Sequence, residues 1–133
     1  MRSLLAATVL LATCLVASVA TAANDKVSAN FESLAASGVV GDVTLNPMPD
    51  GTIQLSSKLR GLQPGVQYVL QIHDASTSCA DGTNTIQVIT FVSNPAGNAN
   101  VKERVTVPVP TIQSIAIREQ PANTAVACAT LPL

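Results

Sequence analysis

The chain has 133 residues, one histidine, no tryptophan and a formal net charge of −1. This length suits one domain. The charge is balanced and shows no basic stripe, so nucleic acid is not expected as a partner. Aromatic residues make up only 2% of the chain, so its core must be built mainly from Val, Ile, Leu and Ala.

The N-terminus has the layout of a secretory signal peptide. Arg2 precedes an apolar stretch from Leu4 to Ala20, and small residues follow it, with cleavage expected after Ala22. A membrane anchor is the alternative, but the stretch is borderline for the roughly 20 residues needed and no basic cluster follows. A lipoprotein reading through Cys14 is weak because threonine precedes the cysteine. The sequence therefore predicts a signal peptide over 1–22, a secreted (extracellular or periplasmic) protein, and no membrane span after cleavage.

The remaining chain divides into a flexible N-terminal arm, 23–37, and one β domain, 38–133. Within that domain apolar and polar residues alternate in short runs, most clearly over Ile53–Arg60, and turns rich in Gly, Pro and Asn separate the runs. No segment past residue 38 has a sustained helical period. The expected strands are 39–45, 53–60, 66–73, 85–92, 99–109, 112–117 and 126–131. This pattern predicts an antiparallel sandwich or flattened barrel.

Two cysteines, Cys79 and Cys128, remain after removal of the signal peptide. In an exported chain an isolated pair is most simply a disulfide. It would close a loop of about 50 residues and contribute about 4 kcal/mol if it acts by restricting the unfolded chain.

Several segments carry a family resemblance. They are the turn Gly61–Gly65, the strand Tyr68–His73, Cys79, the strand-turn-strand Phe91–Ala99, and the terminal Val126–Ala129. In order and spacing they resemble the copper/zinc superoxide dismutase family over roughly 38–133. The resemblance implies an all-β Greek-key sandwich or flattened barrel, immunoglobulin-like, with about seven to eight strands and one disulfide.

The metal ligands that the resemblance implies are mostly missing. The family places two histidines two residues apart on one strand, where both reach copper because alternate residues share a face. Gln71 and His73 occupy these positions, Arg118 stands at the last copper histidine, and Ala125 at the substrate-guiding arginine. No histidine other than His73 remains for a zinc loop.

These substitutions argue against catalysis. One histidine does not build a copper site, Gln71 is a poor copper ligand, and the charge of Arg118 repels a cation. We therefore expect no cofactor and a non-catalytic binding or structural role. His73 is expected at the surface at a strand end, beside Arg118 on the outer face.

Two alternatives stay open. In the first, His73 binds copper weakly with Asp74, Met48 or the N-terminal amine, for copper handling or residual dismutation. In the second, the chain is an immunoglobulin-like adhesion or inhibitor module, which predicts a different strand order. The partner would be an unidentified protein or surface, and homodimerisation stays open.

Overall fold

The computed structural model describes residues 25–74, 79 and 85–131. They form eight strands and one short 3-10 helix: β1 Val27–Ser33, β2 Val40–Pro47, β3 Ile53–Arg60, β4 Gln67–His73, β5 Thr85–Val92, β6 Ala99–Val105, η2 Val109–Thr111, β7 Ser114–Glu119 and β8 Thr124–Thr130. None of the helical structure in this part of the chain is long and apolar enough to cross a membrane. The expected signal peptide lies outside the described residues.

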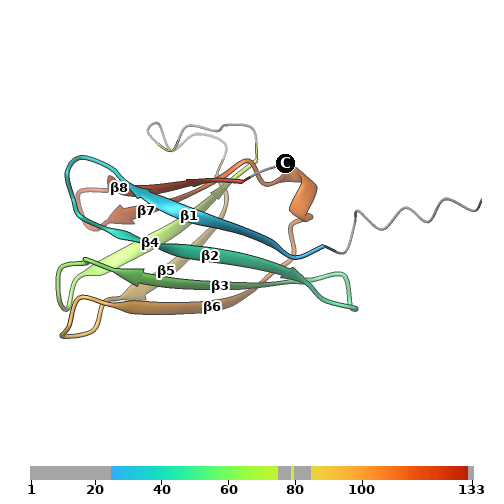
Figure 1. Ribbon diagram of the computed structural model, residues 1–133, viewed down its shortest axis with the longest axis horizontal. Coiled ribbons are helices and arrows are strands. Elements are labelled where there is room, and N and C mark those ends of the chain that lie inside the picture. Colours follow the sequence, from blue (N-terminus) through green and yellow to red (C-terminus); the bar gives the residue numbers. More distant parts are fainter. Residues whose placement is uncertain (1–24, 75–78, 80–84, 132–133) are drawn as a thin grey trace, which may run out of the picture.

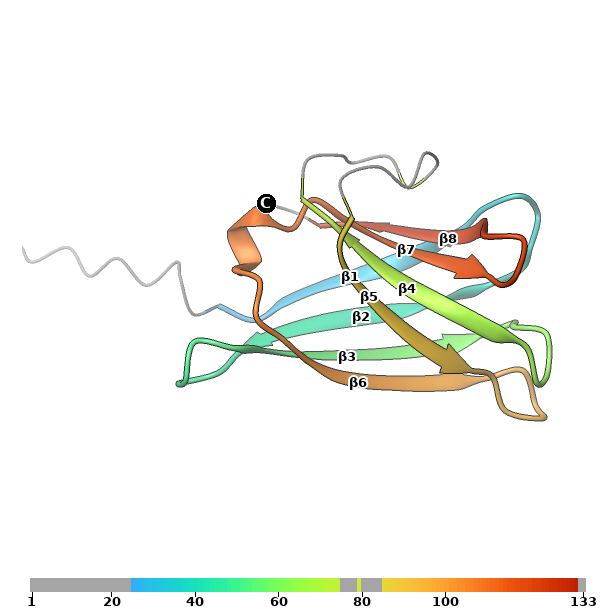
Figure 2. The same cartoon turned by 180° about the vertical axis from the view of Figure 1, so that it is seen from behind.

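The strands pair antiparallel in the order β5-β4-β7-β8-β1-β2-β3-β6. Strands β5 and β6, the two ends of this order, contact each other, so the sheet curls into a nearly closed barrel (Figures 1 and 2). Because β3 pairs with β6 and β4 with β7, the chain crosses between the two layers as in a Greek key. The predicted all-β architecture is confirmed.

The predicted flexible arm is wrong for Val27–Ser33, which form β1. This strand joins the two layers, since it pairs with β2 along most of its length and with β8 at its end. Phe31 is buried in the core, while Val27 and Ala29 pack against it. The alternation is hard to see in the sequence because Ala, Asn and Ser fill most of the strand, so the domain begins earlier than predicted.

The predicted strand 99–109 is also too long. Strand β6 ends at Val105, and η2 follows with Pro108 at its N-cap. Val105 pairs with Ile53, the first residue of β3, so the ladder has no partner residue beyond it, and Pro108 further on has no backbone N–H to donate to a strand.

A tight turn precedes β4. Gly61 has a φ of 77°, and a Cβ atom there would lie 2.2 Å from the Gly38 carbonyl oxygen, so no other residue fits without a shift of the backbone. The Gln63 N–H donates a 2.9 Å hydrogen bond to the Tyr68 hydroxyl. The Tyr68 ring stacks on Phe91 with centroids 5.8 Å apart. One buried tyrosine thus ties the turn to both β4 and β5.

We expect the protein to lose stability above about pH 10 through Tyr68. Burial raises the pKa of this phenol above its ordinary value, the Gln63 N–H opposes the shift, and Glu119 adds to it. The unfolded chain therefore loses the phenolic proton at a lower pH than the folded protein, and alkaline conditions favour unfolding.

Absorbance of the phenolate measures this directly, because Tyr68 is the only tyrosine in the chain. The folded protein should titrate at a higher pH than the same chain in denaturant. Tyr68→Phe should flatten the alkaline loss of stability. Coincident titration curves of the folded and denatured chain would contradict this account.

Candidate functional site

The positions where the family resemblance implies copper ligands lie on the outer face of β4 and β7. The inward residues of these strands, such as Leu70 and Ile117, are buried in the barrel core. The outward residues face each other as three cross-strand pairs: Val69 with Arg118, Gln71 with Ala116, and His73 with Ser114. Arg118 also lies opposite Ala125 on β8. The four sequence-predicted positions therefore share one surface of the sheet.

His73 differs from the prediction in two respects. It is fully buried, with 0% of its surface exposed, rather than a surface residue. It is also not beside Arg118, because the Gln71–Ala116 pair lies between them. Its main-chain carbonyl accepts a 2.8 Å hydrogen bond from the Gln113 N–H, just before β7. Exposure was predicted because His73 comes directly before a polar stretch of sequence. The tertiary contacts that bury it involve residues distant in sequence, so no local pattern indicates them.

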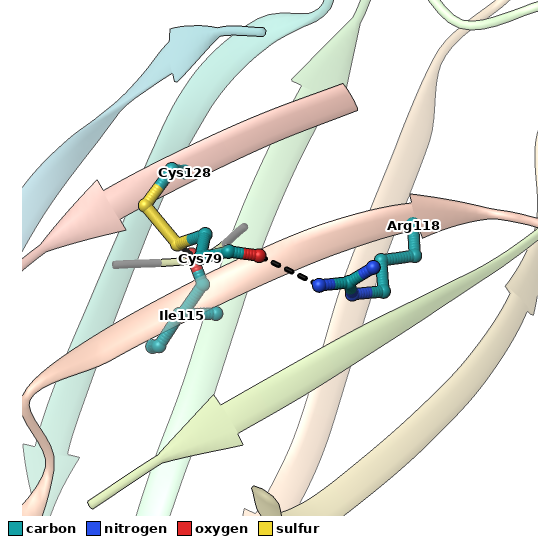
Figure 3. Close-up of a disulfide and its surroundings, with 4 residues drawn as sticks. All are labelled: Cys79, Ile115, Arg118 and Cys128. Carbon is teal, nitrogen blue, oxygen red and sulfur yellow. Dashed lines mark hydrogen bonds between the residues drawn. A yellow bond between two sulfur atoms is a disulfide. The ribbon is translucent and has the colours of Figure 1, made fainter. Parts of the chain in front are cut away.

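Arg118 is a buried cation, with only 5% of its surface exposed. Its Nη2 donates a 2.7 Å hydrogen bond to the main-chain carbonyl of Cys79 (Figure 3), and its Nη1 donates a 2.9 Å bond to that of Asn123. A planar guanidinium can bridge two acceptors in this way because its donors are fixed in a fork. Arg118 thus joins Cys79 to the β7–β8 turn.

The predicted disulfide is present. Cys79 is bonded to Cys128 on β8, with Cα atoms 5.7 Å apart and 49 residues apart in sequence. The Sγ atom of Cys79 also lies 3.5 Å from the Ile115 carbonyl oxygen (Figure 3), a contact without a proton because the sulfur is oxidised. Cys79 is therefore held on one side by its sulfur and on the other by the carbonyl that Arg118 binds.

These side chains do not fit a copper centre. His73 carries the only imidazole of the chain. The other side-chain atom near it that could bind a metal is the buried Gln71 Oε1, which accepts no hydrogen bond from the described residues. The Arg118 guanidinium is cationic and has no free lone pair with which to bind a metal ion. No group of three or more His, Cys, Asp or Glu side chains comes together among residues 25–74, 79 and 85–131. Protein copper sites normally use several nitrogen or sulfur ligands in a defined geometry.

Of the auxiliary ligands considered for His73, Asp74 and Met48 are not assembled around it, and the N-terminal amine lies outside the described residues. Asp74 is exposed, whereas His73 is buried. Met48 lies in the β2–β3 turn and lines a small pocket with Pro47 and Pro108. The structure does not bring either side chain into a common site with the histidine.

Comparison with known proteins places this architecture in one fold class. No protein-family profile and no curated protein sequence matches the chain. Its structure matches those of superoxide dismutases, so the barrel has a superoxide-dismutase-like fold.

The solved structures in question are of superoxide dismutase 5 from Candida albicans. The Cu(II) form is 18% identical, with a TM-score of 0.59 over 81% of this chain and 91% of that one. A point variant of the same enzyme is 17% identical, with a TM-score of 0.60 over 83% and 92%. At this identity the likeness shows the fold alone. The strand order and these matches favour the superoxide-dismutase-like alternative over an immunoglobulin-like module.

Removal of the disulfide should be costly. Replacing both cysteines, Cys79→Ala with Cys128→Ala, should lower the free energy of unfolding by about 4 kcal/mol, because the unfolded chain regains the freedom of the closed loop. Denaturant titration of the oxidised protein and of the double variant measures the difference. Reducing agent should destabilise the unmodified protein and leave the variant unchanged. Equal stability of the two proteins would show that the cross-link contributes nothing.

Arg118→Lys should destabilise the protein by about 1–3 kcal/mol. A single ammonium does not reproduce the guanidinium fork, so a buried charge and a buried carbonyl lose a charge-assisted hydrogen bond. The matched control is Arg60→Lys, an exposed position where the change should stay within about 0.5 kcal/mol. Denaturant unfolding of both variants tests this, and a neutral Arg118→Lys would mean that the bridge is not stabilising.

Proposed function

We propose that this chain is an exported, non-catalytic binding or structural protein built on a superoxide-dismutase-like scaffold. The observation that carries the proposal is Arg118, whose buried guanidinium occupies a position where the fold's resemblance implies a copper histidine and donates to the carbonyls of Cys79 and Asn123. A fixed positive charge there disfavours a metal cation. The same side chain supports the fold instead.

Export is supported by the signal-like residues 1–22 and by the disulfide. Disulfides persist mainly in oxidising compartments, such as the extracellular space and the bacterial periplasm. The Cys79–Cys128 bond attaches Cys79 to β8, and Cys79 is buried, which suits a structural cross-link rather than an exchanging one. The expected partner is therefore another protein or a surface outside the cytoplasm.

Copper loading and superoxide decay test the absence of catalysis. The purified chain is incubated with Cu(II), dialysed, and assayed for bound metal by elemental analysis and for dismutation. We expect less than stoichiometric copper and no acceleration of superoxide decay. Stoichiometric copper with dismutation would overturn the proposal.

Two variants sharpen this experiment. Gln71→His combined with Arg118→His removes the buried cation and places three imidazoles on one face, so it should retain more copper than the unmodified chain. His73→Ala tests the copper-handling alternative. Copper that is bound without dismutation by the unmodified chain and lost in His73→Ala would replace the proposal with metal handling.

A further inference from the structure

A polar groove lies on the layer of the barrel opposite the Arg118 face. It occupies the outer surface of β1, β2, β3 and β6, the strands that lie in front in Figure 1, and has a volume of about 680 Å³. It lies where β3 ends and β6 begins. Polar side chains dominate its lining: Asn30, Asp42, Lys58, Arg60, Asn98 and Asn100. None of them belongs to the positions where the fold's resemblance implies metal.

Strand register builds this lining into a row. Asn30 lies opposite Asp42, Asp42 opposite Lys58, and Lys58 opposite Asn100, so four strands present one continuous line of polar groups. All four residues are exposed. Arg60 lies two residues beyond Lys58 on the same face, which adds a second cation to the end of the row.

The side-chain hydrogen-bonding groups of this row are not used within the described part of the protein. Asp42 and Lys58 are directly opposed, yet no ion pair joins them, and their side chains make no hydrogen bond there. The Arg60, Asn30 and Asn100 side chains are likewise without a described hydrogen bond. By contrast, Arg104 on β6 forms a 2.9 Å salt bridge with Asp50. The groove therefore holds charges and amides that a ligand could engage.

The chemistry of the row indicates the class of ligand. Asparagine amides donate and accept hydrogen bonds, which suits hydroxyl groups, and the ionised Asp42 carboxylate can accept hydrogen bonds from hydroxyls but donates none. Lys58 and Arg60 favour carboxylates, to which a guanidinium can bind through two hydrogen bonds. We propose that this groove binds a polyuronate, a polysaccharide chain that carries many hydroxyls and spaced carboxylates.

Two observations disfavour a densely charged polymer such as a nucleic acid. Asp42 would face the ligand from the middle of the row and repel closely spaced phosphates or sulfates. The groove also offers no exposed aromatic ring for a base to stack on, because Phe31, the aromatic residue in its lining, is buried. A polyuronate has no bases that need a stacking partner, and its hydroxyls can donate hydrogen bonds to Asp42 while its carboxylates bind Lys58 and Arg60.

This inference rests on the proposed function only in treating the chain as a binding protein. The copper assay reports on the β4–β7 face, and polysaccharide binding reports on the β1-β2-β3-β6 face. Failure of one assay is therefore distinguishable from failure of the other.

Calorimetric titration of the purified chain with oligogalacturonate tests the inference, with neutral dextran, heparin and a short DNA duplex as comparison ligands. We expect saturable binding of oligogalacturonate and at least about tenfold weaker binding of the other three. Lys58→Gln with Arg60→Gln should weaken oligogalacturonate binding at least about tenfold, because charge-assisted hydrogen bonds are lost. No saturable binding, or preference for dextran, heparin or DNA, would overturn the inference.

A charge-matched control separates the groove from the general charge of the protein. Lys26→Gln with Lys102→Gln removes the same two charges from exposed positions outside the groove and should change affinity less than about threefold. Equal loss in both double variants would overturn the proposed site. Asp42→Asn should strengthen heparin binding, since it removes the repulsion assigned to that carboxylate, and unchanged heparin binding would contradict that role. Unfolding curves for each variant show whether the fold is retained.

Discussion

The attachment of Cys79 to the barrel is the constraint on which the Arg118 face depends. Its sulfur is bonded to β8 and its carbonyl is bound by Arg118 on β7, so two different strands hold one residue. The covalent bond restricts the unfolded chain, whereas the guanidinium acts only in the folded state. The two attachments therefore hold the same residue in different ways: the disulfide lowers the entropy of the unfolded chain, and the guanidinium adds hydrogen bonds to the folded state.

A buried guanidinium is expensive unless its donors are satisfied, because removing a charge from water costs several kcal/mol. Hydrogen bonds from Arg118 to two main-chain carbonyls, those of Cys79 and of Asn123 in the β7–β8 turn, offset part of this cost. Ala125 lies opposite it and leaves space for the long side chain. On this face of the sheet, Arg118 thus stabilises the fold by linking Cys79 to the β7–β8 turn.

Much of the fold could be predicted from the sequence because its signals are local. The alternation in Ile53–Arg60 and the turn at Gly61–Gly65 are readable from neighbouring residues, and both are present. Strand β1 was missed because small polar residues obscure its alternation, and its pairing with β2 and β8 is long-range. The disulfide followed from cysteine number and the expected compartment.

The candidate site was only partly predictable for the same reason. Sequence reasoning found the positions Gln71, His73, Arg118 and Ala125, and strand register places them on one face. It did not find that His73 is buried or that Arg118 binds the Cys79 carbonyl, since both depend on contacts between segments distant in sequence. The groove was missed because Asn30, Asp42, Lys58 and Asn100 come from four separate strands and align only through their register.

The contacts that hold this barrel together do not require metal ligands. Tyr68 binds the turn through Gln63 and stacks on Phe91, and the aliphatic core fills the space between the layers. The outward-facing residues of β4 and β7 can therefore vary without loss of these interactions, and Arg118 on the same face adds new ones. Because fold and chemistry rest on different residues, one scaffold can carry different sites on either of its two layers.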